Sequence, residues 1–351
     1  MFKFFLSICV SLLLSLSTTP LIRNFFINRG WVEDPIIKNK KTKNATAISS
    51  VPRGGGIPIY IAIVATCLFF LPLDKHLFGI IIAALFSLII GVWDDIKDIS
   101  PKLRLVSNLI TAIIVVSSGI GIAYISNPLG GGVIDLSFLK INFNLLGPHS
   151  IWVISDFLAI IWIIWCMNIV GWATGVDGQL PGFTAISAIF IGILGLRYSS
   201  DITQWPVIIL SGAVCGAYIG FLPFNFFPQS IMPGYSGKSL AGFFLAVLAI
   251  LSGAKLATLV LLLGVPMIDG IITILRRLIK HQPLYLGDGQ HFHHQLLKNG
   301  WSRRSIALVY WFFSFILGLI SLFLNSSQKF YVFFGIFLLF CSLFIHFSRR
   351  S

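Results

Sequence analysis

Long apolar segments alternate with short polar segments from one end of the chain to the other. An α-helix crosses the hydrocarbon core of a bilayer with about 20 apolar residues, and most of these segments approach that length. The pattern predicts eleven transmembrane helices, at residues 4–23, 56–73, 77–93, 104–124, 151–170, 182–197, 206–223, 239–252, 255–275, 306–324 and 330–347. No polar segment between them is large enough to fold separately. We therefore expect one all-α integral-membrane domain that comprises residues 1–351.

Two segments have a second interpretation. The first apolar run follows Lys3 and could belong to a signal peptide, but no small-x-small cleavage pattern follows it and many further spans do. An uncleaved first helix is therefore favoured. The segment GGGVIDLSFLKINFNLLG, residues 130–147, alternates apolar and polar residues and predicts a short β-hairpin on the extracytoplasmic side.

The basic residues predict the orientation. The chain is 56% hydrophobic and 11% charged, with a formal net charge of +13. With the N-terminus outside, the expected inner segments carry 19 of the 25 Lys and Arg residues, as the positive-inside rule requires. We therefore expect a cell-membrane protein with a basic cytoplasmic face. Because topology explains the charge, nucleic-acid binding is not expected. Nucleotides and anionic lipid headgroups are the ligands that such a face attracts.

A carboxylate cluster lies where one apolar run ends, in FGIIIAALFSLIIGVWDDIKDIS. Asp94 and Asp98 are four residues apart and repel each other on one helical face, and Asp95 adds a third charge. A divalent cation would relieve this repulsion, and hard cations prefer oxygen ligands. Lys102 and Arg104 follow and would suit a metal–phosphate site. The alternative is a solvated acidic loop that merely ends the span.

Three glycine-containing motifs also lie on the expected cytoplasmic side. Arg53 in VPRGGGIPIY could pair with an anion that the glycine backbone approaches closely, or it could belong to a flexible loop. Asp177 in MNIVGWATGVDGQLPG, with Asn168 before it, could reach a shared site, or it could complete an ordinary Asp-Gly turn. Lys238 in MPGYSGKSLAG opens a span whose N–H groups could face an anion or be capped by a serine.

The last cluster combines a carboxylate in an apolar run with a histidine loop. Asp269 inside a predicted span is itself a functional-site hypothesis. Downstream, LGDGQHFHHQLLKNG contains Asp288, His291, His293 and His294. A zinc site would need ligand spacing or a second cluster, and neither is present. Hydrogen bonding to phosphates or to a nucleotide is therefore favoured over metal binding.

These clusters, in this order, resemble the polyprenyl-phosphate N-acetylhexosamine-1-phosphate transferases of glycosyltransferase family 4. The resemblance is carried by PRGGG at 52–56, DDIKD at 94–98, GVDG at 175–178 and the segment Pro266–Gly300. The aspartate pair together with the histidine loop is specific, whereas PRGGG alone would be a weak signal. The family includes the phospho-N-acetylmuramoyl-pentapeptide transferase and N-acetylglucosamine-1-phosphate transferases. Eleven spans are more similar to the N-acetylglucosamine branch.

The resemblance implies a reaction and its partners. A UDP-N-acetylhexosamine would donate its sugar-1-phosphate to a membrane polyprenyl phosphate, commonly undecaprenyl phosphate. The products would be polyprenyl-diphospho-sugar and UMP, in the first membrane step of cell-wall or surface-polysaccharide synthesis. Mg²⁺ or Mn²⁺ would be the cofactor, and a homodimer in the bilayer would fit the family. Because the chemistry occurs between two anions, it needs charge neutralisation and in-line positioning more than covalent catalysis.

The same resemblance assigns roles by position. Asp94, Asp95 and Asp177 would be catalytic and would hold the metal, with Asp94 as the group that deprotonates the acceptor phosphate. The substrate-binding set would be Arg53, Lys102, Arg104, Asn168, Lys238, Asp269, Arg277, Asp288, His291, His293 and His294. Lys102 or Arg104 would match a basic position of the family, but only loosely.

The chain departs from the family pattern at four positions. Gly171 replaces an asparagine, Thr174 replaces an aspartate and Gln179 replaces a leucine. Tyr235 stands where the family has a metal-binding aspartate, and a neutral phenol is a poor Mg²⁺ ligand. Lys238 could supply part of the lost electrostatic function. We therefore expect a divergent, active transferase.

Two other function classes stay open. A catalytically silent homologue would bind lipid phosphate or nucleotide without turnover. A transporter or flippase would need ionisable residues along a path across the membrane, whereas here they gather on one face.

Overall fold

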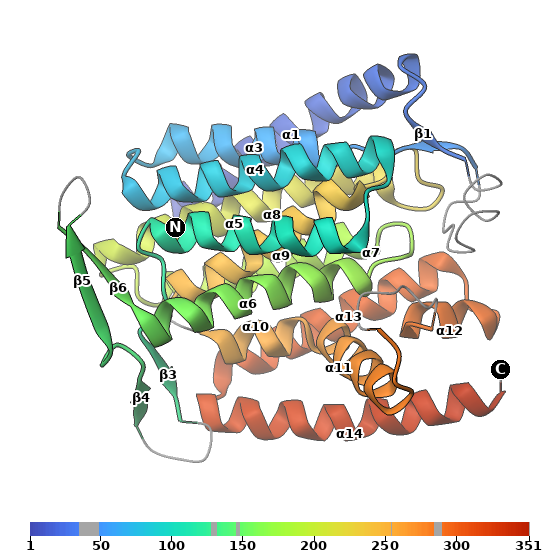
Figure 1. The fold of residues 1–351 in the computed structure, drawn as a ribbon. Helices are drawn as coiled ribbons and strands as arrows, with labels where there is room; N and C mark the ends of the chain where they lie inside the picture. The colour runs from blue at the N-terminus through green and yellow to red at the C-terminus, as the bar shows by residue number, and fades with distance from the viewer. Residues whose placement is uncertain (35–48, 128–131, 145–147, 254, 284–289, 351) are drawn as a thin grey trace.

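The structure is a computed structural model that describes residues 1–34, 49–127, 132–144, 148–253, 255–283 and 290–350 (Figure 1). These residues are mainly helical. The helices are α1 (Phe2–Asn28), α3 (Gly56–Phe70), α4 (Lys75–Lys97), α5 (Pro101–Ser117), α6 (Val153–Trp172), α7 (Gln179–Leu196), α8 (Trp205–Asn225), α9 (Gly234–Leu251), α10 (Leu256–Leu262), α11 (Gly264–Ile279), α12 (Phe292–Lys298), α13 (Arg303–Phe323) and α14 (Ser326–Arg350), with a 3-10 turn η1 (Ile202–Gln204).

All eleven apolar segments form helices, but a count of eleven transmembrane spans is not confirmed. Within the described residues, seven helices are long and apolar enough to cross a membrane: α1, α4, α6, α7, α8, α9 and α13. α3 and the apolar part of α14 are shorter, and α5 has 17 residues and a more polar face. The structure therefore supports a polytopic helical membrane protein with a smaller number of full-length spans.

The expected span at 255–275 is broken into two helices. α10 and α11 meet at an angle of 87°, so together they make at most one bent span. Pro266 lies in the first turn of α11, where a missing N–H group is tolerated, but it cannot continue the hydrogen bonding of α10. The bend carries α11 across the bundle beside α12 (Figure 1).

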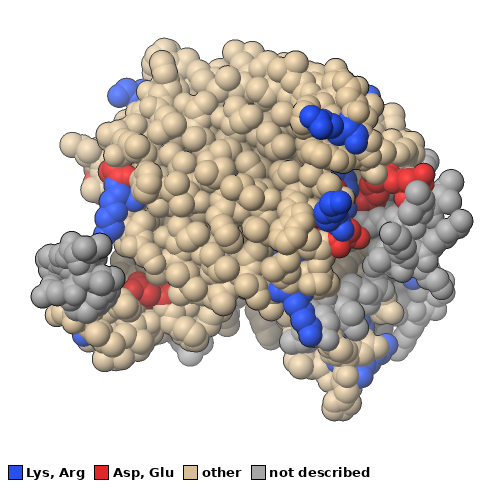
Figure 2. All heavy atoms as spheres, turned by 45° about the horizontal axis from the view of Figure 1, so that its top comes forward, with Lys and Arg blue, Asp and Glu red and all other residues tan. Residues whose placement is uncertain are grey.

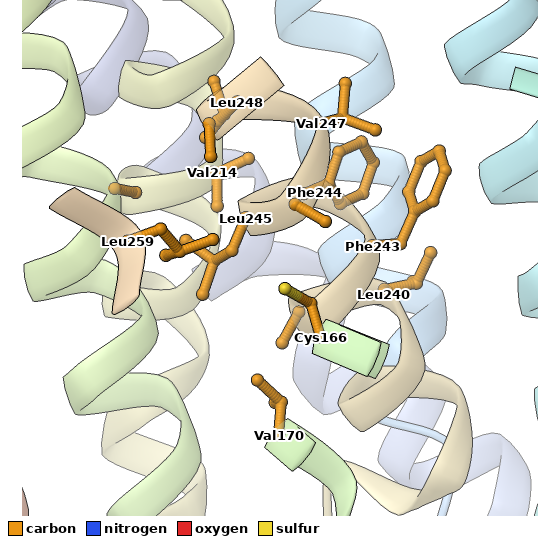
Figure 3. Packing of buried hydrophobic residues seen from close by; sticks show 14 of the residues in the cluster. Cys166, Val170, Val214, Leu240, Phe243, Phe244, Leu245, Val247, Leu248 and Leu259 are labelled. Carbon is orange, nitrogen blue, oxygen red and sulfur yellow. The ribbon is translucent and has the colours of Figure 1, made fainter. Parts of the chain in front are cut away.

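Helix α9 forms the centre of the bundle. Its apolar side chains contact α6 through Cys166 and Val170, α8 through Val214 and α10 through Leu259 (Figure 3). Because α9 is buried on almost all sides, it carries few polar residues after its first two turns. The polar residues at its beginning, Tyr235, Ser236 and Lys238, are therefore held in place by a rigid element.

Helix α1 packs closely along α8 as part of this bundle. Ser7, Ser11 and Ser15 are fully buried at four-residue intervals, and Ser11 donates a hydrogen bond to the carbonyl oxygen of Ala213 at 2.6 Å. Gly216 faces the same stripe, and a Cβ there would clash with the backbone of α1. Small residues on both helices permit this close approach.

The strands differ from the expected hairpin. β3 (Tyr124–Ser126) pairs with β4 (Val133–Asp135), and β5 (Lys140–Asn144) pairs with β6 (Pro148–Trp152), both antiparallel. The segment predicted to form one hairpin thus contributes one strand to each of two ribbons, because each strand finds its partner outside the segment. A third pair, β1 (Val32–Glu33) with β2 (Val51–Pro52), lies at the opposite end of the bundle (Figure 1).

Charged residues gather at the two ends of the bundle. Figure 2 shows a broad face of uncharged residues, with Lys, Arg, Asp and Glu confined to its margins. The end of α4, the start of α5, the end of α6, the start of α9 and α12 all lie at the end away from the β3–β6 ribbons (Figure 1). Helix termini from distant parts of the sequence therefore meet at one end.

Candidate functional site

Asp94 lies at the end of α4 between two arginines. Its side chain is fully buried, and Oδ1 accepts a hydrogen bond from Arg104 Nε at 2.6 Å and from the backbone N–H of Ile99 at 3.1 Å. Arg53 Nη2 lies 3.6 Å from the other carboxylate oxygen. Asp98 closes the helix in the left-handed conformation at φ 54° and accepts from Arg104 Nη2 at 2.8 Å. The expected repulsion between the carboxylates is thus relieved by guanidinium groups.

Asp95 is bonded to the beginning of α9. One carboxylate oxygen accepts from the backbone N–H of Tyr235 at 2.6 Å. The other accepts from the hydroxyl of Ser236 at 2.5 Å and from its N–H at 3.3 Å. A carboxylate at a helix N-terminus satisfies N–H groups that have no intrahelical partner, and it opposes the positive end of the dipole. Asp95 therefore joins α4 to α9 and also faces Arg53.

Tyr235 does not take the place of a metal-binding carboxylate. Its hydroxyl donates to Asn108 Oδ1 at 2.9 Å, and the guanidinium of Arg104 lies over its ring, 5.2 Å from the centroid. The guanidinium of Arg104 therefore contacts the face of the Tyr235 ring and is also paired with Asp94 and Asp98. In this chain the position serves to orient an arginine.

Lys238 reaches the loop between α6 and α7. Its Nζ donates to the carbonyl oxygen of Thr174 at 2.7 Å. Gln179 holds the same loop, because its amide donates to the carbonyl oxygen of Ala173 and accepts from the N–H groups of Gly175 and Val176. Two of the departures from the family pattern, Thr174 and Gln179, thus belong to one hydrogen-bonded loop that contacts α9.

Asp177 is paired with an arginine that the sequence interpretation missed. Its Oδ1 lies 3.2 Å from Arg303 Nη1, at the start of α13, and its Oδ2 accepts from the N–H of Gln229 at 3.4 Å. Burial raises the pKa of Asp177, although Arg303 acts in the opposite direction. One signal could have identified Arg303: it lies in a basic pair at the end of the histidine loop, on the expected inner face.

Asp269 positions the histidine segment. Its Oδ2 lies 3.1 Å from His291 Nδ1, and its Oδ1 accepts from the N–H of Phe292 at 3.0 Å. The ring of His293 stacks on that of His291 with centroids 5.9 Å apart. Both ring nitrogens of His293 are buried without a hydrogen-bond partner among the described residues. Gly175 lies directly against His293, because a Cβ there would clash with the ring. The histidines and the loop that carries Thr174 and Asp177 are therefore adjacent.

These histidines predict a pH dependence of stability. Burial, reinforced by His291, lowers the pKa of His294 to about 4, and burial lowers that of His293 well below its usual value. In the unfolded chain both would protonate near pH 6.5, so acidification from about 6.5 to 4 favours unfolding. We expect His294→Gln to lose less thermal stability than wild type between about pH 7 and pH 5. The exposed His76→Gln is the control and should follow the wild-type profile. Identical profiles for His294→Gln and wild type would contradict this prediction.

The remaining predicted residues divide among several locations. Arg277 is buried with its guanidinium 5.8 Å from the Trp172 ring centroid, and Asn168 donates to the Ile164 carbonyl of its own helix. Lys102 is exposed at the start of α5. Asp288 lies outside the described residues.

One pocket of about 550 Å³ is lined by basic and polar residues and by apolar side chains of α5, α6 and α11. Its polar end is formed by Arg53, Arg104, Lys238, Tyr235 and Asn168. Its walls are Pro101, Leu105, Ile161, Ile164, Trp165, Met167, Gly171, Trp172 and Ile274. Of the two basic candidates on α5, Arg104 lines this pocket and Lys102 does not.

The described carboxylates do not fit the expected metal site. Within the described residues, no three Asp, Glu, His or Cys side chains are grouped so that they could hold one ion. Asp94 is bonded to Arg104, both oxygens of Asp95 accept from α9, and Asp177 pairs with Arg303. Each oxygen that a hard cation would need is therefore engaged or faces a guanidinium. Glu33, which contacts Arg53 at 3.4 Å, is a further charged member of the site that the sequence interpretation missed.

Comparisons with known proteins identify relatives of this chain. The sequence pattern of glycosyl transferase family 4 matches residues 77–253, half of the chain. A probable undecaprenyl-phosphate N-acetylglucosaminyl 1-phosphate transferase of Bacillus subtilis is 29% identical over 346 residues, which cover 97% of this chain and 90% of the relative. A phospho-N-acetylmuramoyl-pentapeptide-transferase of Methylacidiphilum infernorum is 28% identical over 332 residues, which cover 84% of this chain and 85% of the relative. A decaprenyl-phosphate N-acetylglucosaminephosphotransferase of Mycobacterium leprae is 26% identical over 294 residues, which cover 75% of this chain and 70% of the relative.

Proposed function

Because this chain belongs to glycosyl transferase family 4, we propose that it transfers a sugar-1-phosphate from a UDP-N-acetylhexosamine to a membrane polyprenyl phosphate. The products are polyprenyl-diphospho-sugar and UMP. The relatives act on different amino sugars by their names, an N-acetylglucosamine and an N-acetylmuramoyl-pentapeptide. We take the N-acetylglucosamine donor as the first candidate, because the Bacillus subtilis protein matches nearly the whole chain.

The single observation that carries this proposal is the composition of the pocket. Its polar end presents Arg53, Arg104 and Lys238, and none of the described residues that line it is a carboxylate. Its walls are apolar side chains of α5, α6 and α11. A phosphate fits the cationic end, where arginine can bind two of its oxygens at once. An isoprenoid chain fits the apolar walls and can leave towards the bilayer.

We assign the donor to the neighbouring loop and histidines. His293 and His294 stay neutral at physiological pH because burial lowers the pKa of each. Neutral imidazoles can both donate and accept hydrogen bonds with a nucleotide or diphosphate. The loop that carries Thr174 and Asp177 lies between these rings and Lys238, so it separates the donor side from the acceptor pocket.

The chemistry then follows from charge. An oxygen of the acceptor phosphate attacks the sugar-bearing β-phosphorus of the UDP-sugar, and the bond to the oxygen that bridges the two phosphorus atoms breaks. UMP leaves with that bridging oxygen, so no atom has to come from another reactant. Arg53, Arg104 and Lys238 reduce the repulsion between the two anions. Asp94 is buried behind the two arginines, so we assign it the role of positioning them, in place of the expected role as base.

A requirement for Mg²⁺ or Mn²⁺ stays a prediction of the family resemblance, and no step is assigned to a metal here. The experiment that tests the function is UMP release by purified protein, with undecaprenyl phosphate and a panel of UDP-sugars, in Mg²⁺ and in EDTA. UMP release that needs both acceptor and one donor supports the transferase. Binding of either substrate without UMP release from any donor would favour a catalytically silent homologue.

We also propose that the site faces the cytoplasm, because the basic residues gather with it. In a background without Cys9, Asp98→Cys and Gln290→Cys should be protected from a membrane-impermeant maleimide in sealed cells. The control Lys140→Cys, on β5 at the other end, should be labelled. Labelling of position 98 or 290 from outside would reverse the proposed orientation.

A further inference from the structure

Arg53 lies among four carboxylates, which is more negative charge than one guanidinium can neutralise. Its guanidinium nitrogens are within 3.9 Å of four acidic side chains, namely Glu33 at 3.4 Å, Asp94 at 3.6 Å, Asp95 at 3.6 Å and Asp98 at 3.9 Å. Its side chain is only 14% exposed. A charge so enclosed is stabilised by the acids around it, and those acids are equally stabilised by Arg53.

One carboxylate oxygen depends particularly on this arginine. Asp94 Oδ2 is buried and has no hydrogen-bond partner within the described part of the chain. The guanidinium of Arg53 faces it at 3.6 Å, beyond ordinary hydrogen-bond distance. Arg104 engages the opposite oxygen of the same carboxylate. Removing Arg53 would therefore leave Asp94 Oδ2 with no cation facing it, and Arg104 on the opposite oxygen would remain.

The backbone around Arg53 is built to hold it in this place. Arg53 forms an isolated bridge with Met232, whose carbonyl oxygen accepts from the N–H of Gly55 at 3.1 Å. Gly54 has a φ of 138°, and a Cβ on Gly55 would clash with Phe221. The three consecutive glycines thus allow the loop to pack against the segment before α9, which brings Arg53 to the carboxylates.

We propose that Arg53 is the resident counter-cation of the Asp94–Asp95 pair and competes with divalent metal ions for it. The pair therefore does not act as a metal site while Arg53 holds its place. A divalent ion at the pair would have to lie close to this guanidinium, and like charges at such distances repel strongly in a buried site. The inference concerns the same site as the proposed function, but metal binding tests it without turnover.

The test is a Mn²⁺ titration of the purified full chain, read as loss of the free-ion signal in electron paramagnetic resonance. Arg53→Gln should bind Mn²⁺ at least about tenfold more tightly than wild type, since one nearby positive charge is removed. The matched control is Lys97→Gln, which removes the same charge from an exposed residue at the end of α4. Equal affinities for Arg53→Gln and Lys97→Gln would overturn the proposal.

Two further variants locate the effect. The double variant Arg53→Gln/Asp94→Asn should lose the gained Mn²⁺ affinity, and persistence of that gain would place the ion elsewhere and overturn the proposal. If Arg53→Gln does not fold, Arg53→Lys decides the question. Its ammonium reaches fewer of the four carboxylates than a guanidinium fork, so a gain of about threefold is expected. No gain in a folded Arg53→Lys protein would also overturn the proposal. If the wild-type protein releases no UMP, the proposed function fails, but the Mn²⁺ titration still tests the role of Arg53.

Discussion

Arg104→Ala is expected to lower kcat/KM for UMP release by about a thousandfold, because it removes a charge that stabilises the phosphates in the transition state. The guanidinium lines the pocket and is held by Asp94 at 2.6 Å, by Asp98 at 2.8 Å and by the ring of Tyr235. Its removal also leaves Asp94 in the pocket's neighbourhood with one cation fewer. Steady-state kinetics at varied acceptor concentration provide the measurement.

Lys102→Ala is the matched control for this prediction. Lys102 has the same charge, lies two residues earlier on α5 and does not line the pocket. We expect its kcat/KM within about threefold of wild type, as for a typical change at an exposed surface charge. A large loss in Lys102→Ala together with near-normal Arg104→Ala would show that the pocket is not the acceptor site.

Asp95→Asn is expected to reduce the free energy of unfolding by about 3 kcal/mol, as when a buried charged partner is removed. Asp95 accepts hydrogen bonds from Tyr235 N–H, Ser236 N–H and Ser236 Oγ, and an asparagine would turn an N–H₂ group towards some of these donors. Because α9 is the central helix, its loosened start should lower the melting temperature as well as activity. Thermal unfolding in one detergent provides the measurement.

Asp98→Asn is the control for the Asp95 substitution. It makes the same chemical change at a half-exposed carboxylate, and asparagine tolerates the left-handed conformation at this position. We expect a loss of about 1 kcal/mol or less, in line with a solvent-exposed ion pair. An Asp95→Asn protein that melts like wild type but releases no UMP would instead show that Asp95 acts in the chemistry.

Properties that reside in short stretches of sequence could be predicted well. The apolar segments coincide with helices, because side-chain hydrophobicity and helix length are local properties. The polar motifs were also expected to lie together on one side of the membrane. In the structure Arg53 lies 3.6 Å from both Asp94 and Asp95, and Asp95 is bonded to the start of α9, which carries Lys238. Basic residues and polar motifs between spans are enough for that expectation.

Properties that depend on distant segments could not be predicted. The aspartate pair suggested a cation, but the cations that neutralise it come from Arg53 and Arg104, on other elements. The donors that bind Asp95 lie 140 and 141 residues further along the chain. Tyr235 reads as a lost metal ligand in the sequence, whereas its contacts with Asn108 and Arg104 give it a different role.

Two features of the backbone could not be predicted for the same reason. They are the bend between α10 and α11 and the pairing of the strands in the two ribbons. An apolar run does not reveal an 87° break, and an alternating pattern does not reveal which strand is its partner. A sequence pattern reports the preference of each residue for water or for lipid. The partner of each buried charge is chosen when helices pack, because that is when a carboxylate must find a donor or a cation nearby.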